Sequence, residues 1–386
     1  MNLGSEQFEA LVEGMCEQIL AFPHQKVAFW APTTMEVILT LFAIWKVGKI
    51  ACPLNTRLPS AESALQALET ELFTPRLPQP KTPTPTNWDL SKLATFLFTS
   101  GSTGLPKIAG HSLGNHVWNA RGSNEMIPLE STDRWALTLP LFHVGGLGVL
   151  FRCYLAKCSV TFDRPDATHL SLVPTQLYRL LKEQTPLPHL KTILLGGAPL
   201  PNLSTPWNVL PTYGMTEMSS QIVTGHKVHP YAEVKISSDQ EIWVRGATLF
   251  QGYYTQGKIA CPLNEEGWFL TSDLGRWHEG QFQVIGRKDN LFISGGENIQ
   301  PEEIEEAIRR HCEVNEAIVV PIADEEFGER PAVFLKHPEE FPKIQELLKP
   351  HIPKYKIPIR AFRLPPETGL KPNRKALKGL ISTSLS

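Results

Sequence analysis

A glycine- and hydroxyl-rich stretch, Thr99-Ser-Gly-Ser-Thr-Gly-Leu-Pro-Lys107, is the part of this sequence with the clearest chemical use. It follows residues 93–98, a short apolar run whose aromatic and β-branched residues predict a buried strand. Glycines let a backbone approach a ligand closely, and consecutive N–H groups can then surround an anion. Hydroxyls add donors, and Lys107 adds a positive charge. The stretch therefore predicts a binding loop for a polyphosphate.

A flexible surface loop is the alternative interpretation of this stretch. A plain linker, however, needs neither a buried strand in front of it nor a fixed Pro-Lys pair behind it. The stretch is also not a Walker loop, because Lys107 does not directly follow a glycine and no helix signal comes after it. Phosphate binding by another kind of loop remains the prediction.

Five further short stretches, which follow one another along the chain, contain polar side chains that could take part in binding or chemistry. They lie at 140–144 (PLFHV), 213–217 (YGMTE), 271–273 with 286–289 (TSD and GRKD), 294–304 (SGGENIQPEEI) and 364–374 (LPPETGLKPNR). A lone YGxTE is weak evidence, but here it follows a Gly196-Gly197-Ala198 turn. Together with the loop, this set resembles the adenylate-forming (AMP-binding) superfamily, to which the acyl-CoA synthetases belong.

The resemblance implies a site for ATP and Mg²⁺. Tyr213 would stack on adenine, Thr216 would bind the reacting phosphate or carboxylate, and Glu217 would supply a hard oxygen ligand for Mg²⁺. Asp273 and Arg287 would bind the ribose hydroxyls, although a turn or helix cap is the plainer role for Asp273. The full predicted ATP set is Thr99, Ser100, Gly101, Ser102, Thr103, Gly104, Lys107, Gly197, Ala198, Tyr213, Gly214, Thr216, Asp273 and Arg287.

The resemblance also implies a site for the acid to be activated. His143 would gate or anchor the carboxylate, although a lone loop histidine more often has a structural role. Gly146 and Arg152 would contact the rest of the acid; a surface arginine on a helix is the alternative for Arg152. At two nearby positions this chain has Gly145 and Leu147, where relatives commonly have serine and glutamine.

In this superfamily a carboxylate attacks the α-phosphate of ATP and pyrophosphate leaves, a step that depends on positioning and charge neutralisation. Lys371 is the predicted catalytic lysine, with Leu370 before it in place of the commoner glycine; Thr216 and His143 complete the predicted catalytic set. The acyl-adenylate must then meet a thiol. The resemblance therefore implies a C-terminal domain that rotates about a hinge at Asp289.

Several stretches resemble one branch of the superfamily, the ligases that join 2-succinylbenzoate to coenzyme A in menaquinone and phylloquinone biosynthesis. They are residues 139–148 with Arg152, 171–180, 194–199, 267–269 and 289–303. The acid of that branch has a succinyl carboxylate, which is activated, and a second carboxylate on the ring. A fixed cation is expected for the second one, because a partly buried unpaired anion is costly. Arg152 is the predicted cation.

Three alternatives remain open at this level. The acid could be another aryl or medium-chain carboxylic acid, and the acyl acceptor could be a carrier protein instead of CoA. A non-catalytic nucleotide-binding protein on the same fold is the third, although it would have no reason to keep Lys107, Glu217, Asp273, Arg287 and Lys371 together. A homo-oligomer is neither predicted nor excluded.

Bulk properties fit this class of enzyme. The chain has 386 residues, enough for two or three domains, and its formal net charge of −2 argues against nucleic acid as a main partner. Six cysteines without a CxxC pair indicate free thiols in a reducing compartment. The N-terminus lacks a signal-peptide pattern, and the longest apolar run, 37–45, is too short to span a bilayer. A cytoplasmic protein without integral membrane association is expected.

The predicted organisation is an α/β protein with two domains, a large one over 1–287 and a small mobile α+β one over 288–386. Residues 1–73 look helical, with helices near 8–15 and 35–47, and a Pro-rich connector at about 74–88 looks extended and poorly packed. Strands and helices alternate from 93 to 287, and residues 241–245 and 281–285 predict antiparallel strands. The small domain begins with a helix at Pro301. From Lys336 onward, eleven Lys/Arg face four Asp/Glu, as in a solvated basic surface or a lid that approaches phosphates.

Overall fold

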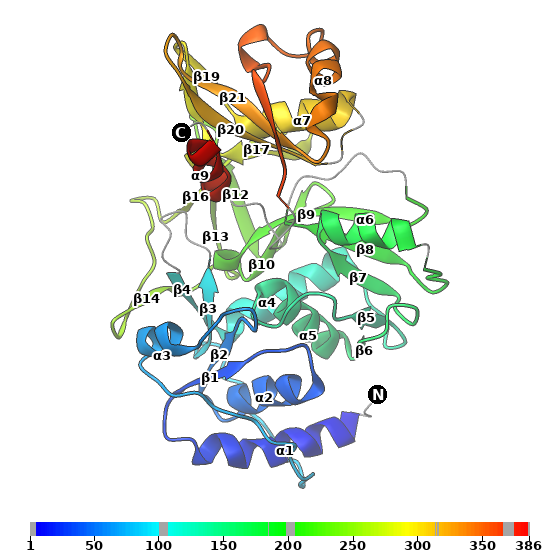
Figure 1. Cartoon of the computed structure of the whole chain (residues 1–386). Helices are drawn as coiled ribbons and strands as arrows, with labels where there is room; N and C mark the ends of the chain where they lie inside the picture. Colours follow the sequence, from blue (N-terminus) through cyan, green and yellow to red (C-terminus); the bar gives the residue numbers. More distant parts are fainter. Residues whose placement is uncertain are drawn as a thin grey trace.

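The structure is a computed structural model, and it describes residues 5–99, 107–183, 185–197, 205–312, 314, 316–365 and 374–384. In these ranges the strands form four sheets, and the helices pack around them. Figure 1 shows a large body that carries the N-terminus and a smaller lobe at the top that carries the C-terminus. The predicted α/β architecture, a large N-terminal part with a smaller C-terminal part, is confirmed.

A six-stranded sheet holds the two ends of the predicted phosphate loop. Its order is β1-β2-β3-β4-β14-β15, with bounds Lys26–Trp30, Ile50–Leu54, Leu93–Thr99, Lys107–Ser112, Gly252–Thr255 and Lys258–Ala260. The strand predicted over 93–98 is confirmed as β3, and it pairs antiparallel with β4 so that Thr99 lies opposite Lys107. The parallel pair β1 and β2 corrects the expectation of a helical segment over residues 1–73, since apolar runs this short fit helices and strands equally well.

A seven-stranded sheet carries the residues of the YGMTE stretch. Its order is β11-β10-β9-β8-β7-β5-β6, with bounds Lys227–Val228, Ser220–Thr224, Val209–Met215, Thr192–Gly196, His169–Leu172, Arg134–Ala136 and Ser159–Thr161. The five strands β5 to β9 are parallel, whereas β10 is antiparallel to β9. A 3-10 turn, Thr216–Met218, joins β9 to β10. The sheet thus turns the chain back on itself at Thr216 and Glu217.

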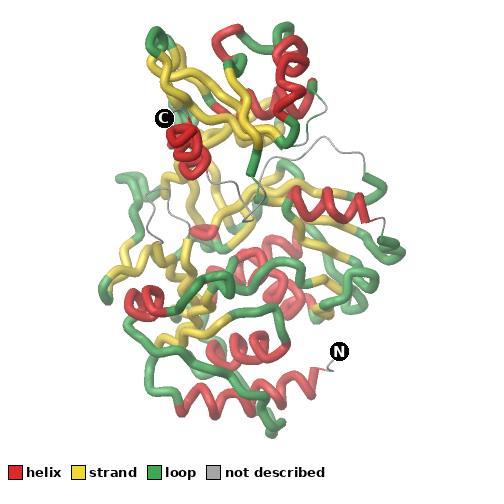
Figure 2. The backbone as a smooth tube through the Cα atoms, viewed as in Figure 1, coloured by secondary structure: helices red, strands yellow, loops and turns green. Residues whose placement is uncertain are grey.

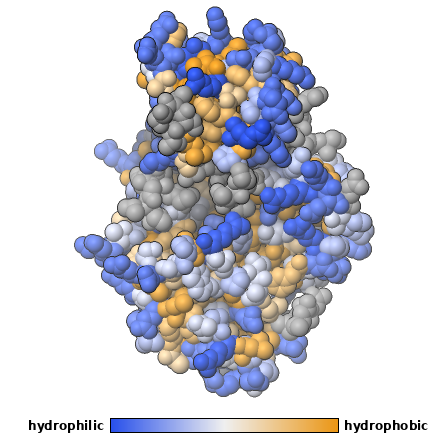
Figure 3. Space-filling model, viewed as in Figure 1, coloured by the Kyte–Doolittle hydropathy of each residue, from blue (hydrophilic) through white to orange (hydrophobic). Residues whose placement is uncertain are grey.

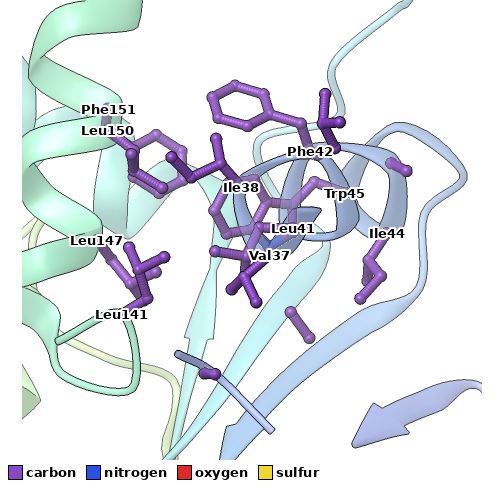
Figure 4. Packing of buried hydrophobic residues seen from close by; sticks show 14 of the residues in the cluster. Val37, Ile38, Leu41, Phe42, Ile44, Trp45, Leu141, Leu147, Leu150 and Phe151 are labelled. Atoms are coloured by element: carbon purple, nitrogen blue, oxygen red, sulfur yellow. The ribbon is translucent and has the colours of Figure 1, made fainter. Parts of the chain in front are cut away.

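Helices of the large body cover these two sheets. They are α1 (Ser5–Ala21), α2 (Met35–Lys46), α3 (Glu62–Leu68), α4 (Leu113–Met126), α5 (Val144–Ala156) and α6 (Pro174–Glu183). Helix α2 begins where the Thr34 hydroxyl accepts a hydrogen bond from the Val37 N–H, a typical N-cap. Its apolar face packs on α5, as Figure 4 shows, and the rings of Trp45 and Phe151 lie 4.7 Å apart. This contact fixes α5, the helix that contains Arg152.

The rest of the chain forms two antiparallel or mixed sheets with their own helices. The four-stranded sheet β12-β13-β16-β17 has bounds Ala232–Ile236, Glu241–Gly246, Phe269–His278 and Gln281–Arg287. The last sheet has the order β19-β18-β21-β20, with β22 beside β21, and bounds Glu297–Ile299, Phe292–Ser294, Gly328–Leu335, Ala317–Asp324 and Arg360–Arg363. Figure 2 shows this sheet in the upper lobe with helices α7 (Pro301–His311), α8 (Phe341–Leu348) and α9 (Arg374–Ser384). The domain boundary between residues 287 and 288 stays a prediction.

The Pro-rich connector differs from its expected loose packing. It runs along α1, where the Lys81 N–H donates to the Ala10 carbonyl at 2.9 Å and the Thr84 N–H donates to Glu13 at 3.1 Å. Gly14 makes the close approach feasible, because a Cβ at this position would lie 1.9 Å from the Gln79 carbonyl oxygen. Hydrogen bonds from the backbone of this segment to α1 therefore hold it in place. The amino-acid composition of the segment gives no sign of these bonds.

Within the described ranges, no helix combines the length and the apolar character required to cross a bilayer. On the face shown in Figure 3, hydrophilic residues are interspersed with smaller apolar areas.

Four buried histidines lie in the large body. The pKa values of two of them, His111 and His229, lead us to expect a free energy of unfolding that depends on pH. Burial lowers the pKa of His111 to about 4 and that of His229 to about 3, from an ordinary value of 6.5. Below pH 6.5 the unfolded chain gains protons at these positions that the folded chain does not bind. Lowering the pH from 7 to 5 should therefore reduce the free energy of unfolding by about 4 kcal/mol for the two together.

Urea unfolding at pH 7, 6 and 5 checks this expectation. His111→Gln, which keeps an N–H donor but cannot titrate, should show a shallower loss of stability than the parent chain. His278→Gln is the control, because this histidine is exposed. Equal slopes for the parent chain and His111→Gln would show that His111 contributes nothing to the pH dependence.

Candidate active site

A cleft of about 3300 Å³ lies between the large body and the upper lobe. Its lining includes both described ends of the phosphate loop, Thr99 and Lys107, together with side chains from the other predicted motifs. Four Lys/Arg residues of the described C-terminal segment also line it, Lys336, Arg374, Lys375 and Lys378. The motifs that are scattered over more than 180 positions of the sequence therefore face one space.

A three-residue cluster around Asp273 forms one part of the cleft. The Tyr213 hydroxyl donates to one carboxylate oxygen of Asp273 at 2.7 Å, and Arg287 Nη1 donates to the other at 2.9 Å. Strand pairing places Asp273 directly opposite Arg287 in β16 and β17. Burial, and next the Asp273 charge, raise the pKa of Tyr213 well above its ordinary value, so its hydroxyl remains a donor. The two contacts fix the direction of the carboxylate, and a carboxylate oxygen can accept more than one hydrogen bond, as binding of two sugar hydroxyls would require.

A second cluster surrounds Glu217 at the turn between β9 and β10. The Tyr253 hydroxyl donates to Glu217 Oε1 at 2.7 Å, and Lys107 Nζ lies 4.9 Å from the centre of the Tyr253 ring. The neighbouring backbone is held as well, since His111 Nε2 lies 2.7 Å from the Thr216 carbonyl oxygen. Burial keeps the His111 ring neutral, and because a carbonyl oxygen can only accept, the ring carries its hydrogen on Nε2. The cluster places one carboxylate and one ammonium group on either side of a tyrosine.

The donor set around Glu217 fits a magnesium ion that is bound mainly by phosphates. In the part of the chain that the structure describes, no group of three or more His, Cys, Asp or Glu side chains could hold a metal. Mg²⁺ usually keeps several waters and binds through one or two carboxylates plus substrate phosphates. Tyr253 occupies Oε1 of Glu217, so the second carboxylate oxygen remains for an ion.

Two predicted ATP-site glycines have clear positions. Gly214 lies where β9 approaches β10 so closely that a Cβ would come within 2.0 Å of the Ser220 carbonyl oxygen. Gly197 follows β8 with φ +87°, and both residues line the cleft. Thr216 lines it too. Their contacts with a nucleotide stay predictions.

The predicted acid-binding residues gather around the start of α5. His143 is the N-cap of this helix, is exposed and lines the cleft. Arg152, two turns further along, is only 1% exposed, which excludes the alternative of a surface arginine. Its Nη2 lies 3.4 Å from the Ser220 hydroxyl. Gly146 is buried, and a Cβ there would lie 2.2 Å from the Pro140 carbonyl oxygen, so the glycine allows the 140–144 loop to pack on α5.

The structure describes Asp289 but not all of the remaining predicted site residues. Asp289, the predicted hinge, is exposed and accepts a hydrogen bond from Arg287 Nη2 at 3.2 Å. Seven predicted site residues lie outside the described residues: Ser100, Gly101, Ser102, Thr103, Gly104, Ala198 and Lys371.

Family models match most of this architecture. The model of the AMP-binding enzyme family matches residues 63–254, and that of the AMP-binding enzyme C-terminal domain matches residues 303–371. The 2-succinylbenzoate–CoA ligase of Escherichia coli K12 is 39% identical over a 316-residue alignment that covers 75% of this chain and 70% of the relative. This chain belongs to the AMP-binding enzyme family. The resemblance drawn from the motifs is thereby confirmed.

Solved structures of AMP-binding enzymes share the fold. Wild-type E. coli MenE with a bound m phenylether-linked analogue of OSB-AMS matches with a TM-score of 0.84 and 32% identity, over 99% of this chain and 94% of that chain. MenE from Bacillus subtilis in complex with the acyl-adenylate intermediate OSB-AMP matches with a TM-score of 0.80 and 28% identity, over 96% and 92%. The B. subtilis enzyme has also been solved in complex with ATP and magnesium ion, and that structure matches with a TM-score of 0.79.

Two residues of this AMP-binding enzyme take part in the clusters although the sequence did not single them out. Tyr253 belongs to a short aromatic strand, and nothing in its neighbourhood marks a contact with a residue 36 positions away. His111 follows the phosphate loop in the stretch HSLGNH, where two histidines so close together were the available signal. Both contacts arise only when β4, β14 and the Thr216–Met218 turn come together.

Proposed function

We propose that this chain is an AMP-forming acid–CoA ligase that activates 2-succinylbenzoate. The first half-reaction joins the succinyl carboxylate to the α-phosphate of ATP and releases pyrophosphate. The second transfers the acyl group from the adenylate to the thiol of CoA and releases AMP. The product would serve menaquinone or phylloquinone biosynthesis, and the free thiol state of all six cysteines suits a reducing cytoplasm.

The burial of the Arg152 side chain is the observation that best supports 2-succinylbenzoate as the acid. Its Nε and Nη1 atoms are buried and have no hydrogen-bond partner among the described residues. Burial lowers the pKa of the guanidinium only to about 10, so it stays charged at neutral pH. A buried cation with free N–H donors beside a cleft is suited to a carboxylate, which can accept from two of them at once. The ring carboxylate of 2-succinylbenzoate is a ligand of this kind.

The nucleotide half of the cleft supports the first step. Asp273 accepts the ribose hydroxyls and Arg287 stays paired with it, so the sugar fixes the position of the phosphates. Lys107 adds positive charge near them, while a Mg²⁺ ion held by Glu217 and the phosphates would neutralise charge on the leaving pyrophosphate. Lys371 is proposed to act on the same phosphates. The ribose of ATP is held by Asp273 and the ring carboxylate of the acid by Arg152. The succinyl carboxylate then attacks the α-phosphorus in line with the departing pyrophosphate.

A panel of acids tests the proposal directly. The purified chain would be incubated with ATP, Mg²⁺ and CoA plus one of 2-succinylbenzoate, 3-benzoylpropionate (the same acid without the ring carboxylate), benzoate or octanoate. Pyrophosphate release reports adenylation, and mass spectrometry of the thioester reports transfer to CoA. We expect 2-succinylbenzoate to give the highest kcat/KM and to yield 2-succinylbenzoyl-CoA. A higher kcat/KM for any acid without the second carboxylate would overturn the choice of substrate.

Arg152→Met separates the role of the cation from that of the fold, because methionine keeps an apolar chain of similar length. Loss of a charge-assisted pair should raise KM for 2-succinylbenzoate roughly 30-fold. KM for ATP, and kcat/KM for 3-benzoylpropionate, should change little. An unchanged KM for the diacid would remove Arg152 from the acid site.

A further inference from the structure

Trp135 lies directly against the arginine that faces the acid. It is the central residue of the short strand β5 and is 1% exposed. The Cζ atom of Arg152 lies 5.1 Å from the centre of its ring, within the range of a cation–π contact. No feature of the sequence motifs assigns a role to this tryptophan.

Two side chains of the neighbouring strand β7 hold the Trp135 ring in place. Its indole N–H donates to the Ser171 hydroxyl at 3.1 Å, and the His169 ring stacks on it with centres 5.1 Å apart and 29° between the planes. Both neighbours belong to β7, which pairs with β5. A buried indole with its N–H satisfied cannot rotate without losing that bond. The aromatic face that Arg152 contacts is therefore fixed.

The polar groups that surround Arg152 are uncharged. Ser220 meets its Nη2 at 3.4 Å, and the Asn124 side chain donates to its backbone carbonyl at 3.0 Å. His229 is buried and neutral, since its side chain takes part in a hydrogen bond with the Thr224 hydroxyl at 2.9 Å while burial disfavours its charged form. None of the ion pairs formed between described residues includes Arg152, whose charge is instead faced by the π system of Trp135.

A π face and a carboxylate would stabilise this buried cation in different ways. An aspartate or glutamate would occupy the N–H donors of Arg152 and neutralise its charge, and a substrate carboxylate would then have to displace it. An aromatic face attracts the cation through its quadrupole and leaves the in-plane N–H donors free. The pair Trp135–Arg152 therefore gives a cation that is held in place but still available to an anion.

We infer that Trp135 is a specificity-determining positioning residue, which holds Arg152 in the cleft for the second carboxylate of the acid without neutralising it. This inference rests on the proposed function. It predicts that Trp135 matters for the diacid and not for an acid that lacks the ring carboxylate. The relevant quantity is the specificity ratio, kcat/KM for 2-succinylbenzoate divided by kcat/KM for 3-benzoylpropionate.

Two substitutions test the inference. Trp135→Leu removes the π face and should lower the specificity ratio roughly 30-fold, which corresponds to about 2 kcal/mol, while KM for ATP stays within about 2-fold. Trp135→Phe keeps a weaker quadrupole without the indole N–H, and it should lower the ratio roughly 3-fold to 5-fold. Thermal melting shows whether the leucine variant folds. If it does not, Trp135→Phe alone tests the inference, and a specificity ratio equal to that of the parent chain overturns it.

A double-mutant cycle separates this role from mere core packing. In an Arg152→Met background, Trp135→Phe or Trp135→Leu should change the ratio no further, because the cation through which Trp135 acts is gone. An equal drop in both backgrounds, or an equal loss of activity with both acids, would make Trp135 a structural residue only. Trp118→Phe is the matched control, because Arg121 lies 5.4 Å from the Trp118 ring outside the cleft lining.

The wild-type chain distinguishes failure of this inference from failure of the proposed function. A wild-type specificity ratio near one would refute the diacid as substrate before any variant is made. A high wild-type ratio that survives Trp135→Leu and Trp135→Phe unchanged would refute the inference about Trp135 and leave the proposed function intact.

Discussion

Glu217→Gln is expected to lower the rate of adenylation roughly 1000-fold, because it removes the negative charge proposed to hold Mg²⁺ beside the phosphates. The amide remains close in size to the carboxylate and can still accept the hydrogen bond from Tyr253. The fold around the turn should therefore be preserved. ATP–pyrophosphate exchange over a range of Mg²⁺ concentrations measures the rate, and calorimetric titration with ATP, with and without Mg²⁺, measures binding. Mg²⁺ should strengthen ATP binding to the parent chain but much less to the variant.

A matched control for this experiment occurs one residue further along β14. Tyr254 donates to Glu69 at 2.7 Å, and Lys26 lies 4.7 Å from the Tyr254 ring, so a second cluster repeats the Tyr–Glu hydrogen bond and the contact between an ammonium group and the ring. Here Lys26 additionally pairs with Glu69 at 3.2 Å. None of these three residues lines the cleft. Glu69→Gln should leave adenylation and its Mg²⁺ dependence unchanged. If both substitutions slow the reaction alike, Glu217 has no special role in binding the ion.

Asp273→Asn should raise KM for ATP roughly 100-fold. The carboxylate is the proposed acceptor for two ribose hydroxyls, and each hydrogen bond to a charged group contributes about 1.5–3 kcal/mol. The change also removes the charge that pairs with Arg287 at 2.9 Å, so the second proposed ribose contact becomes less well positioned. Steady-state kinetics with ATP varied at saturating acid gives the measurement. KM for the acid should change far less than KM for ATP.

Glu233→Gln provides the comparison for Asp273→Asn. Glu233 pairs with Arg245 through two hydrogen bonds, at 3.0 and 2.7 Å, in the same four-stranded sheet but away from the cleft lining. An exposed pair of this kind contributes little to stability, so the variant should behave like the parent chain. A similar rise in KM for ATP in both variants would point to a general disturbance of the sheet and against a ribose contact.

The local sequence was sufficient to predict those helices and strands whose own residues strongly favour that structure. The strand before the phosphate loop, the helix over residues 35–47 and the helix that begins at Pro301 were all predicted and are present as β3, α2 and α7. Each has a strong local signal, such as an apolar run of the right length or proline in the first turn. Strands β1 and β2 were missed because each is only five residues long and lies beside a clear helix pattern, where periodicity alone does not separate a strand from a buried helix segment.

The sequence by itself determined the chemistry of this protein: the residue types of its motifs, in their order along the chain, are sufficient to indicate the family and the reaction. The tertiary structure alone decided how those residues are held. Tyr253 meets Glu217, His111 meets the Thr216 carbonyl and Trp135 meets Arg152 only because strands distant in sequence become neighbours in the sheets. Hydrogen bonds and cation–π contacts require separations of a few ångströms, and periodicity along a chain contains no information about distances between sheets.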